Sequence, residues 1–172
     1  MSAPFRRDAN ARDEIWRSDL VWDWVSIDGS DYFVERIFDD PGFCLVRKNH
    51  LLIDGELSLE LFLEVEHVAL RPTRQHHPRI ERALEKMGLE RKVAVEVSHL
   101  VVMPRIVATT DLVATMPGRL ARLYGKEMNL QVIPNPVYED SVTVYQMWHR
   151  HFEKDEGHRW FREVTKAVAV SA

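Results

Sequence analysis

The chain has 172 residues, of which 45% are hydrophobic, and a formal net charge of −4. This length allows one soluble domain or two small lobes with a buried core, and a negative charge without a long basic run argues against direct DNA binding by this chain. No apolar run approaches the roughly 20 residues of a membrane span, and the polar first residues lack the apolar stretch of a signal peptide.

In chain order, residues 1–17 are polar and weakly patterned, and they stay unassigned. Three segments then predict extended structure, with an interruption at Asp39-Asp40-Pro41: Asp19–Trp24, Tyr32–Phe38 and Gly42–Arg47. Ser58 is a suitable N-cap for a short helix through Val65, and His67–Leu70 is again strand-like.

The clearest helix is predicted at Pro78–Met87. Proline suits the first helical position, and Gly88 suits the position just past the end. Ile80, Ala83, Leu84 and Met87 recur at the i, i+3, i+4, i+7 spacing that buries one helix face.

The segment Val93–Pro117 predicts strand, helix, strand. Valines alternate with polar residues in the first strand, and His99 follows at its carboxyl end. The apolar segment Leu100–Ala108 is helix-like, and Leu112–Thr115 predicts a short strand. Ligands of open α/β sheets collect at the carboxyl ends of strands, which makes His99 a candidate binding residue.

The remaining elements complete an alternation of strands and helices, which is typical of an α/β domain. A helix is predicted at Gly118–Tyr124, and strands are predicted at Leu130–Ile133 and Val142–Met147. A last helix runs from Glu156 to Val168, with Asp155 as N-cap. We expect its inward residues to be Trp160, Val164 and Ala167.

Four stretches resemble, in order, the effector-binding domain of LysR-type transcriptional regulators, especially those that sense aromatic compounds and the nodulation regulators. They are Arg36–His50, Glu66–Arg91, Val93–Pro117 and Met147–Arg162. The resemblance covers about Asp19–Val164. The winged helix-turn-helix and the first strand–helix–strand of the effector domain have no counterpart in it.

The resemblance implies the two-lobed type II periplasmic-binding-protein-like fold, an α/β architecture, N-terminally truncated in lobe I. Lobe I would comprise residues 18–48 and 135–172, and lobe II residues 49–134. The two crossing strands would lie near Cys44–Lys48 and Gln131–Pro136. An incomplete lobe I exposes sheet edges and apolar surface, which favours a homodimer or larger homo-oligomer.

By resemblance, His77 and His99 fall on two histidines that line the effector cleft between the lobes, and Met147 falls on a large apolar residue of lobe I. Arg74 lies just before His77 at a helix N-terminus, a favourable seat for a carboxylate. Trp24 is a candidate aromatic wall from its position alone. Alternatively, His77 is only a helix cap and His99 a hydrogen-bonded structural residue.

Other chemistry finds little support in the sequence. His149, His151 and His158 are better explained as surface histidines at a turn than as zinc ligands. The lone Cys44 excludes an internal disulfide, fits the cytoplasm and lies in an apolar strand, where a thiol is usually inert. No nucleophile elbow or phosphate loop is present. We therefore expect no enzyme activity, no cofactor and no metal.

The hypothesis is an effector sensor: a small aromatic or carboxylated molecule binds between the lobes and shifts their hinge angle. The alternative is a truncated paralogue that binds no ligand and acts by association with a full-length regulator. In either case, its effect on transcription requires a partner chain.

Overall fold

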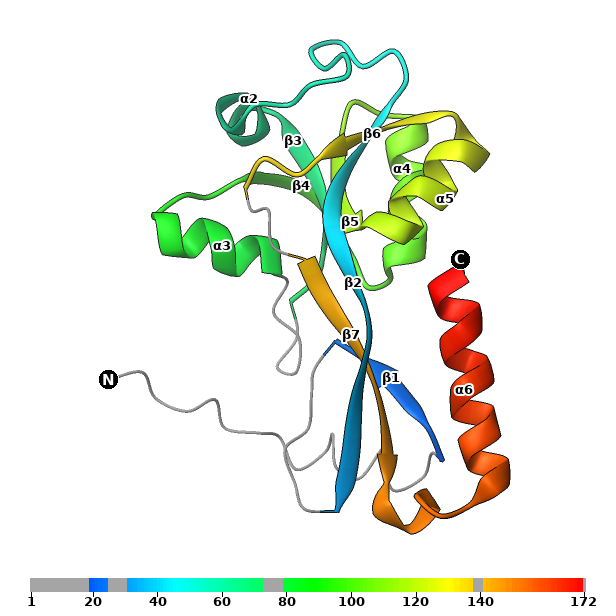
Figure 1. Cartoon of the computed structure of the whole chain (residues 1–172). Coiled ribbons are helices and arrows are strands. Elements are labelled where there is room, and N and C mark those ends of the chain that lie inside the picture. The colour runs from blue at the N-terminus through cyan, green and yellow to red at the C-terminus, as the bar shows by residue number, and fades with distance from the viewer. Residues whose placement is uncertain (1–18, 25–30, 73–78, 138–140, 172) are drawn as a thin grey trace. The chain divides into compact units, whose positions relative to one another are not determined.

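The structure is a computed structural model that describes residues 19–24, 31–72, 79–137 and 141–171 (Figure 1). The described residues form two compact units: unit 1 within Met1–Asp39 and Val142–Ala172, and unit 2 within Asp40–Ser141. Strand β2 (Tyr32–Arg47) contributes its first half to unit 1 and its second half to unit 2. No helix in the described ranges is both long and apolar enough to cross a membrane.

Unit 2 is built around a mixed sheet in which the second half of β2 is followed by β5, β3 and β4, while β6 pairs with β2. The strands after β2 are β3 (Glu66–Leu70), β4 (Lys92–Val97), β5 (Val113–Pro117) and β6 (Leu130–Pro134). Strands β4 and β5 run parallel to β3, whereas β5 and β6 run antiparallel to β2. The carboxyl ends of β3, β4 and β5 therefore meet at one edge of the sheet.

Helices cover both faces of this sheet (Figure 1). They are α2 (Leu59–Glu64), α3 (Arg79–Met87), α4 (Met103–Ala108), α5 (Gly118–Met128) and the 3-10 turn η1 (Leu100–Val102). Alternate strand residues point to opposite faces, so Val113 packs with α2 and α3 in one core while Ala114 packs with α4 and α5 in the other. The result is a three-layer α/β unit.

The predicted helix around residues 79–87 is confirmed over its described part. Ile80 and Leu84 are buried, whereas Met87 is 44% exposed. Gly88 has φ +68°, and the amides of Gly88 and Leu89 donate to the carbonyls of Glu85 and Leu84. These two bonds form a Schellman motif, which ends the helix at a residue with positive φ.

The predicted interruption at Asp39-Asp40-Pro41 is wrong, because β2 continues through it for 16 residues. The acidic side chains are instead used as acceptors: Asp39 binds the hydroxyl of Thr143, and Asp40 binds the Arg119 amide at the start of α5. Proline fits at this position because the pairing of β2 with β5 begins just beyond it, at Gly42, and the pairing with β6 begins at Phe43.

Unit 1 contains β1 (Val21–Asp23), β7 (Ser141–His149, of which residues 142–149 belong to it) and the first half of β2, in the order β1-β7-β2. Strand β1 pairs antiparallel with β7, with Val21 opposite Met147. The 3-10 turn η2 (Arg150–Phe152) leads into α6 (Glu156–Ser171). The predicted cap is confirmed, since Asp155 accepts from the His158 amide at 2.7 Å.

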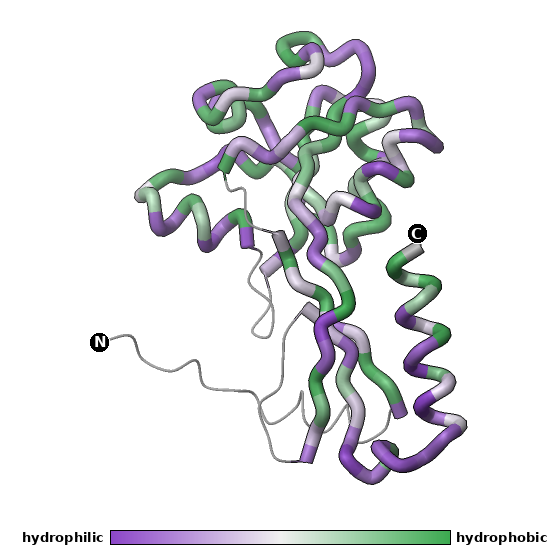
Figure 2. The backbone as a smooth tube through the Cα atoms, viewed as in Figure 1, coloured by the Kyte–Doolittle hydropathy of each residue, from purple (hydrophilic) through white to green (hydrophobic). Residues whose placement is uncertain are grey.

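The predicted inward face of α6 is wrong. Trp160 is 65% exposed and Val164 is 39% exposed, whereas His158, Arg162 and Ala169 are buried. Polar contacts set this orientation: His158 Nε2 donates to the Asp19 carbonyl at 2.7 Å, and the His158 Nδ1 accepts from Arg162 at 2.6 Å. Figure 2 shows hydrophilic and hydrophobic stretches alternating along α6, so hydropathy alone does not define its inner face.

Candidate functional site

The carboxyl ends of β3 and β4 lie side by side in unit 2. Leu70 is in register with Val97, and the next amide, that of Arg71, donates to the Val97 carbonyl at 2.8 Å. The Arg71 side chain pairs with Glu96 at 3.4 Å and is largely exposed. This edge therefore presents a cationic side chain at the position where α/β sheets collect ligands.

His99 stands two residues after the end of β4, at the same edge. Its backbone is extended, and its carbonyl accepts from the Val102 amide to begin η1. The side chain is exposed and makes no capping hydrogen bond. His99 is thus an exposed residue on a short strand-to-helix connection, and its side chain does not cap the helix.

The other predicted site residues are distributed between the units. Arg74 and His77 lie outside the described residues. Met147 is 1% exposed in β7, and Trp24, directly after β1, is 47% exposed. Met147 and Trp24 therefore belong to unit 1 and His99 to unit 2, and a shared cleft for these residues stays a prediction.

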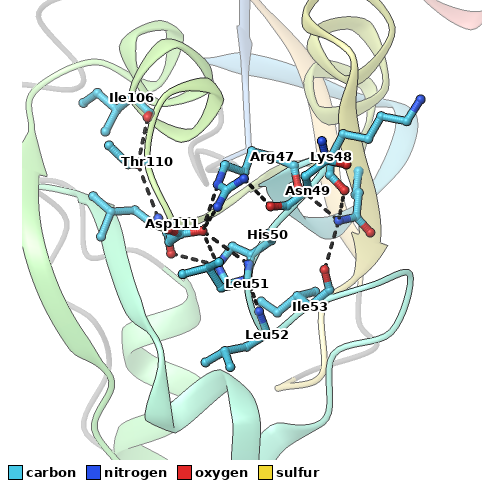
Figure 3. Close-up of polar contacts among 12 residues, drawn as sticks. Arg47, Lys48, Asn49, His50, Leu51, Leu52, Ile53, Ile106, Thr110 and Asp111 are labelled. Carbon is cyan, nitrogen blue, oxygen red and sulfur yellow. Dashed lines mark hydrogen bonds and ion pairs between the residues drawn. The ribbon is translucent and has the colours of Figure 1, made fainter.

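A pocket of about 620 Å³ lies near the amino ends of β3 and β5, whereas His99 follows the carboxyl end of β4. Its polar wall is the network of Figure 3, in which Arg47 Nε donates to the Asp111 carboxylate at 2.8 Å. The buried His50 accepts from the Leu52 amide through Nδ1 and donates through Nε2 to the Asp111 carbonyl. These bonds anchor the loop after β2, and we assign them a structural role.

A second pocket, of about 390 Å³, lies in unit 1 between α6 and the adjoining strands. Its lining is mostly charged and was missed by the sequence reasoning: Glu35, Gln146, Trp148, Arg159, Arg162, Glu163 and Lys166. The residues come from three distant segments. One feature of the sequence could have indicated this pocket: the i, i+4 spacing of His158 and Arg162, which places both residues on one face of a helix.

The explanation of the C-terminal histidines as surface residues is wrong for His158, which is 8% exposed and hydrogen-bonded through both ring nitrogens. His149 Nδ1 accepts from the His151 amide, which closes the turn. Among the residues that the structure describes, no group of three His, Cys, Asp or Glu side chains is placed to hold a metal ion.

Comparison with known proteins gives the family. Residues 18–169 match the model described as LysR substrate binding domain. The transcriptional activator NagR of Ralstonia sp is 29% identical over 133 residues, which cover 77% of this chain and 44% of NagR. The transcriptional regulator SyrM of Rhizobium meliloti (strain 1021) is 32% identical over 142 residues, 82% of this chain and 44% of SyrM. The chain thus spans less than half the length of these relatives.

Solved structures agree in fold. The probable transcriptional regulator PA0477 from Pseudomonas aeruginosa superposes with a TM-score of 0.76 at 21% identity, over 91% of this chain and 52% of that one. The effector binding domain of QuiR, solved in complex with shikimate, superposes with a TM-score of 0.68 at 15% identity, over 90% of this chain and 74% of that one. The predicted type II periplasmic-binding-protein-like α/β fold is confirmed. The matched family is that of the transcription regulators NagR and SyrM, and it is not a family of enzymes. The chain belongs to the LysR substrate-binding domain family.

Proposed function

We propose that this chain senses a small aromatic or carboxylated effector on behalf of a LysR-type transcription regulator in the cytoplasm. The observation that carries the proposal is the placement of His99. Its ring is exposed at the carboxyl end of β4 and is not used as a cap, on a sheet edge where ligands of α/β folds bind. A histidine with only a structural role would be expected to have a hydrogen-bond partner, as His50 and His158 do.

An effector carboxylate buried at this edge needs compensating donors, because an unpaired charge removed from water is costly. His99 offers a ring N–H. Arg71 offers a guanidinium whose ion pair with Glu96 is long at 3.4 Å and largely exposed, so it can be exchanged for a ligand at small cost. Arg74, His77, Met147 and Trp24 remain predicted contacts.

The effector acts by shifting a conformational equilibrium. A ligand changes the populations of two conformations only through its different affinity for them. Transmission to DNA then requires further parts of a regulator, because this chain carries a net charge of −4 and no long basic run.

The proposal is tested by a thermal-shift screen of the purified chain with benzoate, 4-hydroxybenzoate and shikimate. A ligand at 100 times its Kd stabilises the folded state by about 2.7 kcal/mol. We expect at least one of these three acids to raise the Tm of the chain. His99→Ala should weaken the binding of that acid about 10- to 100-fold, since one hydrogen bond to a charged group contributes about 1.5–3 kcal/mol.

The matched control is His151→Ala, which removes an exposed histidine of unit 1. This variant should bind as the wild type does. If the wild type and His99→Ala bind the ligand with equal affinity, His99 is not a ligand contact. If His99→Ala unfolds, His99 has a structural role instead.

A second candidate function is association with another regulator chain without a ligand. The exposed apolar side chains of α6 favour it: Trp160 is 65% exposed and Val168 is 64% exposed. Absence of any stabilising ligand, together with tight binding of the chain to a full-length regulator, would favour this function over sensing.

A further inference from the structure

The charged pocket of unit 1 contains a buried acceptor without a donor. Gln146 is 1% exposed, and its Nε2 donates to a Glu35 oxygen at 2.5 Å, which fixes the orientation of the amide. The other amide atom, Oε1, is buried and has no hydrogen-bond partner among the described residues. Buried acceptors are nearly always paired, so this atom marks a place for a donor.

Neighbouring Glu35 cannot satisfy that need. Its carboxylate accepts from Gln146 on one oxygen and from Lys166 on the other, and a carboxylate offers no donor. Lys166 is in turn committed to Glu35 by this ion pair. The donor that Gln146 Oε1 lacks therefore has to come from outside this cluster.

The helix side of the pocket is cationic. The Arg162 guanidinium lies 4.2 Å above the Trp148 ring, and its NH1 is held by the His158 ring at 2.6 Å and by the Phe152 carbonyl at 3.3 Å. Its NH2 is 3.7 Å from Glu153, which is too long for a good hydrogen bond. Buried and fixed in this way, the guanidinium keeps donor capacity for an anion.

Exposed Arg159 lines the same pocket one helical turn earlier. Together Arg159, Arg162 and Lys166 carry three positive charges, while Glu35 and Glu163 carry two negative ones. The lining residues therefore carry one positive charge in excess, while Glu153, which lies 3.7 Å from Arg162 but does not line the pocket, adds one negative charge nearby. Its volume of about 390 Å³ lies in the range of small-molecule sites.

We propose that this pocket binds a small organic carboxylate that also carries a hydroxyl or amino donor. The carboxylate pairs with Arg159 and Arg162, and the donor binds Gln146 Oε1. All residues that line this pocket belong to unit 1, and none of them is among the contacts proposed for the effector at His99, so the two sites are distinct.

The test uses two probes that differ by one hydroxyl group, mandelate and phenylacetate. Each is titrated into the full chain, and binding is followed by the NMR signal of the Trp148 indole. We expect a saturable shift with mandelate and about tenfold weaker binding of phenylacetate, because it leaves Gln146 Oε1 unpaired. Arg159→Gln should weaken mandelate about tenfold, and Gln146→Leu should remove the preference for mandelate.

The matched control is Arg150→Gln, an exposed arginine of unit 1 that does not line the pocket, and it should bind mandelate as the wild type does. No saturable shift, or equal binding of the two probes, overturns the proposal. A shift abolished by His99→Ala but not by Arg159→Gln also overturns it, while supporting the site in unit 2. If Gln146→Leu does not fold, the effect of Arg159→Gln on mandelate binding decides the test, because Arg159 is exposed and its substitution should not disturb the fold.

Discussion

The burial of Cys44 in the core determines the reactivity of its thiol. The thiol is fully buried in β2, 3.7 Å from the Thr115 hydroxyl, and burial raises its pKa to about 12. Because the thiolate is the reactive form, native protein should react with a thiol reagent at a small fraction of the rate of the urea-unfolded chain. A labelling time course tests this, and equal rates in the two states would contradict the burial.

His67 is the residue whose titration should matter most for stability. It is fully buried, and its Nε2 donates to the Phe62 carbonyl at 2.7 Å. Desolvation lowers its pKa to about 4; the bond to Phe62 opposes this shift, and the charge of Arg91 adds to it. Folding therefore favours the neutral ring.

It follows that the unfolded chain binds a proton at His67 between about pH 6.5 and pH 4, while the folded chain does not. The free energy of unfolding should therefore decrease as the pH is lowered through this window, and it should be roughly 2 kcal/mol smaller at pH 5 than at neutral pH. Urea unfolding at pH 7 and pH 5 measures it. His67→Gln, which keeps a donor for Phe62, should lose this part of the pH dependence. An unchanged dependence in that variant would assign the effect to other groups.

At the scale of elements, the end of α3 depends on Gly88. Its φ of +68° is strained for residues with a Cβ, although no atom lies within 4 Å of an added Cβ. Gly88→Ala should cost about 1 kcal/mol, because strain of 1–2 kcal/mol is partly offset by the stiffer unfolded chain. Urea denaturation measures it. Lys86→Ala, on the exposed side of α3, should change stability little; equal effects of the two variants would exclude backbone strain as the cause.

Elements with local signals were predicted well. Ser58 caps α2, Asp155 caps α6 and Gly88 ends α3, since capping depends on residues within one turn. The errors arose where distant residues decide. Asp40 looked like a turn residue because its role, capping α5, involves Arg119, 79 positions away.

The candidate sites show the same limit. The position of His99 at a strand end followed from alternating valines in one segment. The pocket of unit 1 did not, because Glu35 and Gln146 are 111 positions apart and their contact with α6 depends on which helix face turns inward. Hydropathy placed Trp160 inward, whereas His158 and Arg162, which bond to the carbonyls of Asp19 and Phe152, are the buried residues of this helix turn.

At the scale of the whole molecule, the exposed apolar side chains of α6 favour self-association. Trp160, Val164 and Val168 recur at i, i+4 and i+8, which forms one stripe, and all three are at least 39% exposed. We expect a homodimer in sedimentation at micromolar concentration, and a shift to monomer in Trp160→Glu. A wild-type monomer throughout this range would contradict the expectation, and an unaffected dimer in Trp160→Glu would exclude α6 from the interface.

The effector is proposed to bind at the carboxyl ends of β3 and β4, with His99 among its contacts. Amide hydrogen exchange of the chain, with and without a ligand that raises Tm, tests it most directly. With ligand bound, we expect slower exchange at Arg71 and across residues 97–103, the segments joined by the hydrogen bond from the Arg71 amide to the Val97 carbonyl. Unchanged exchange at these residues under saturating ligand would contradict it.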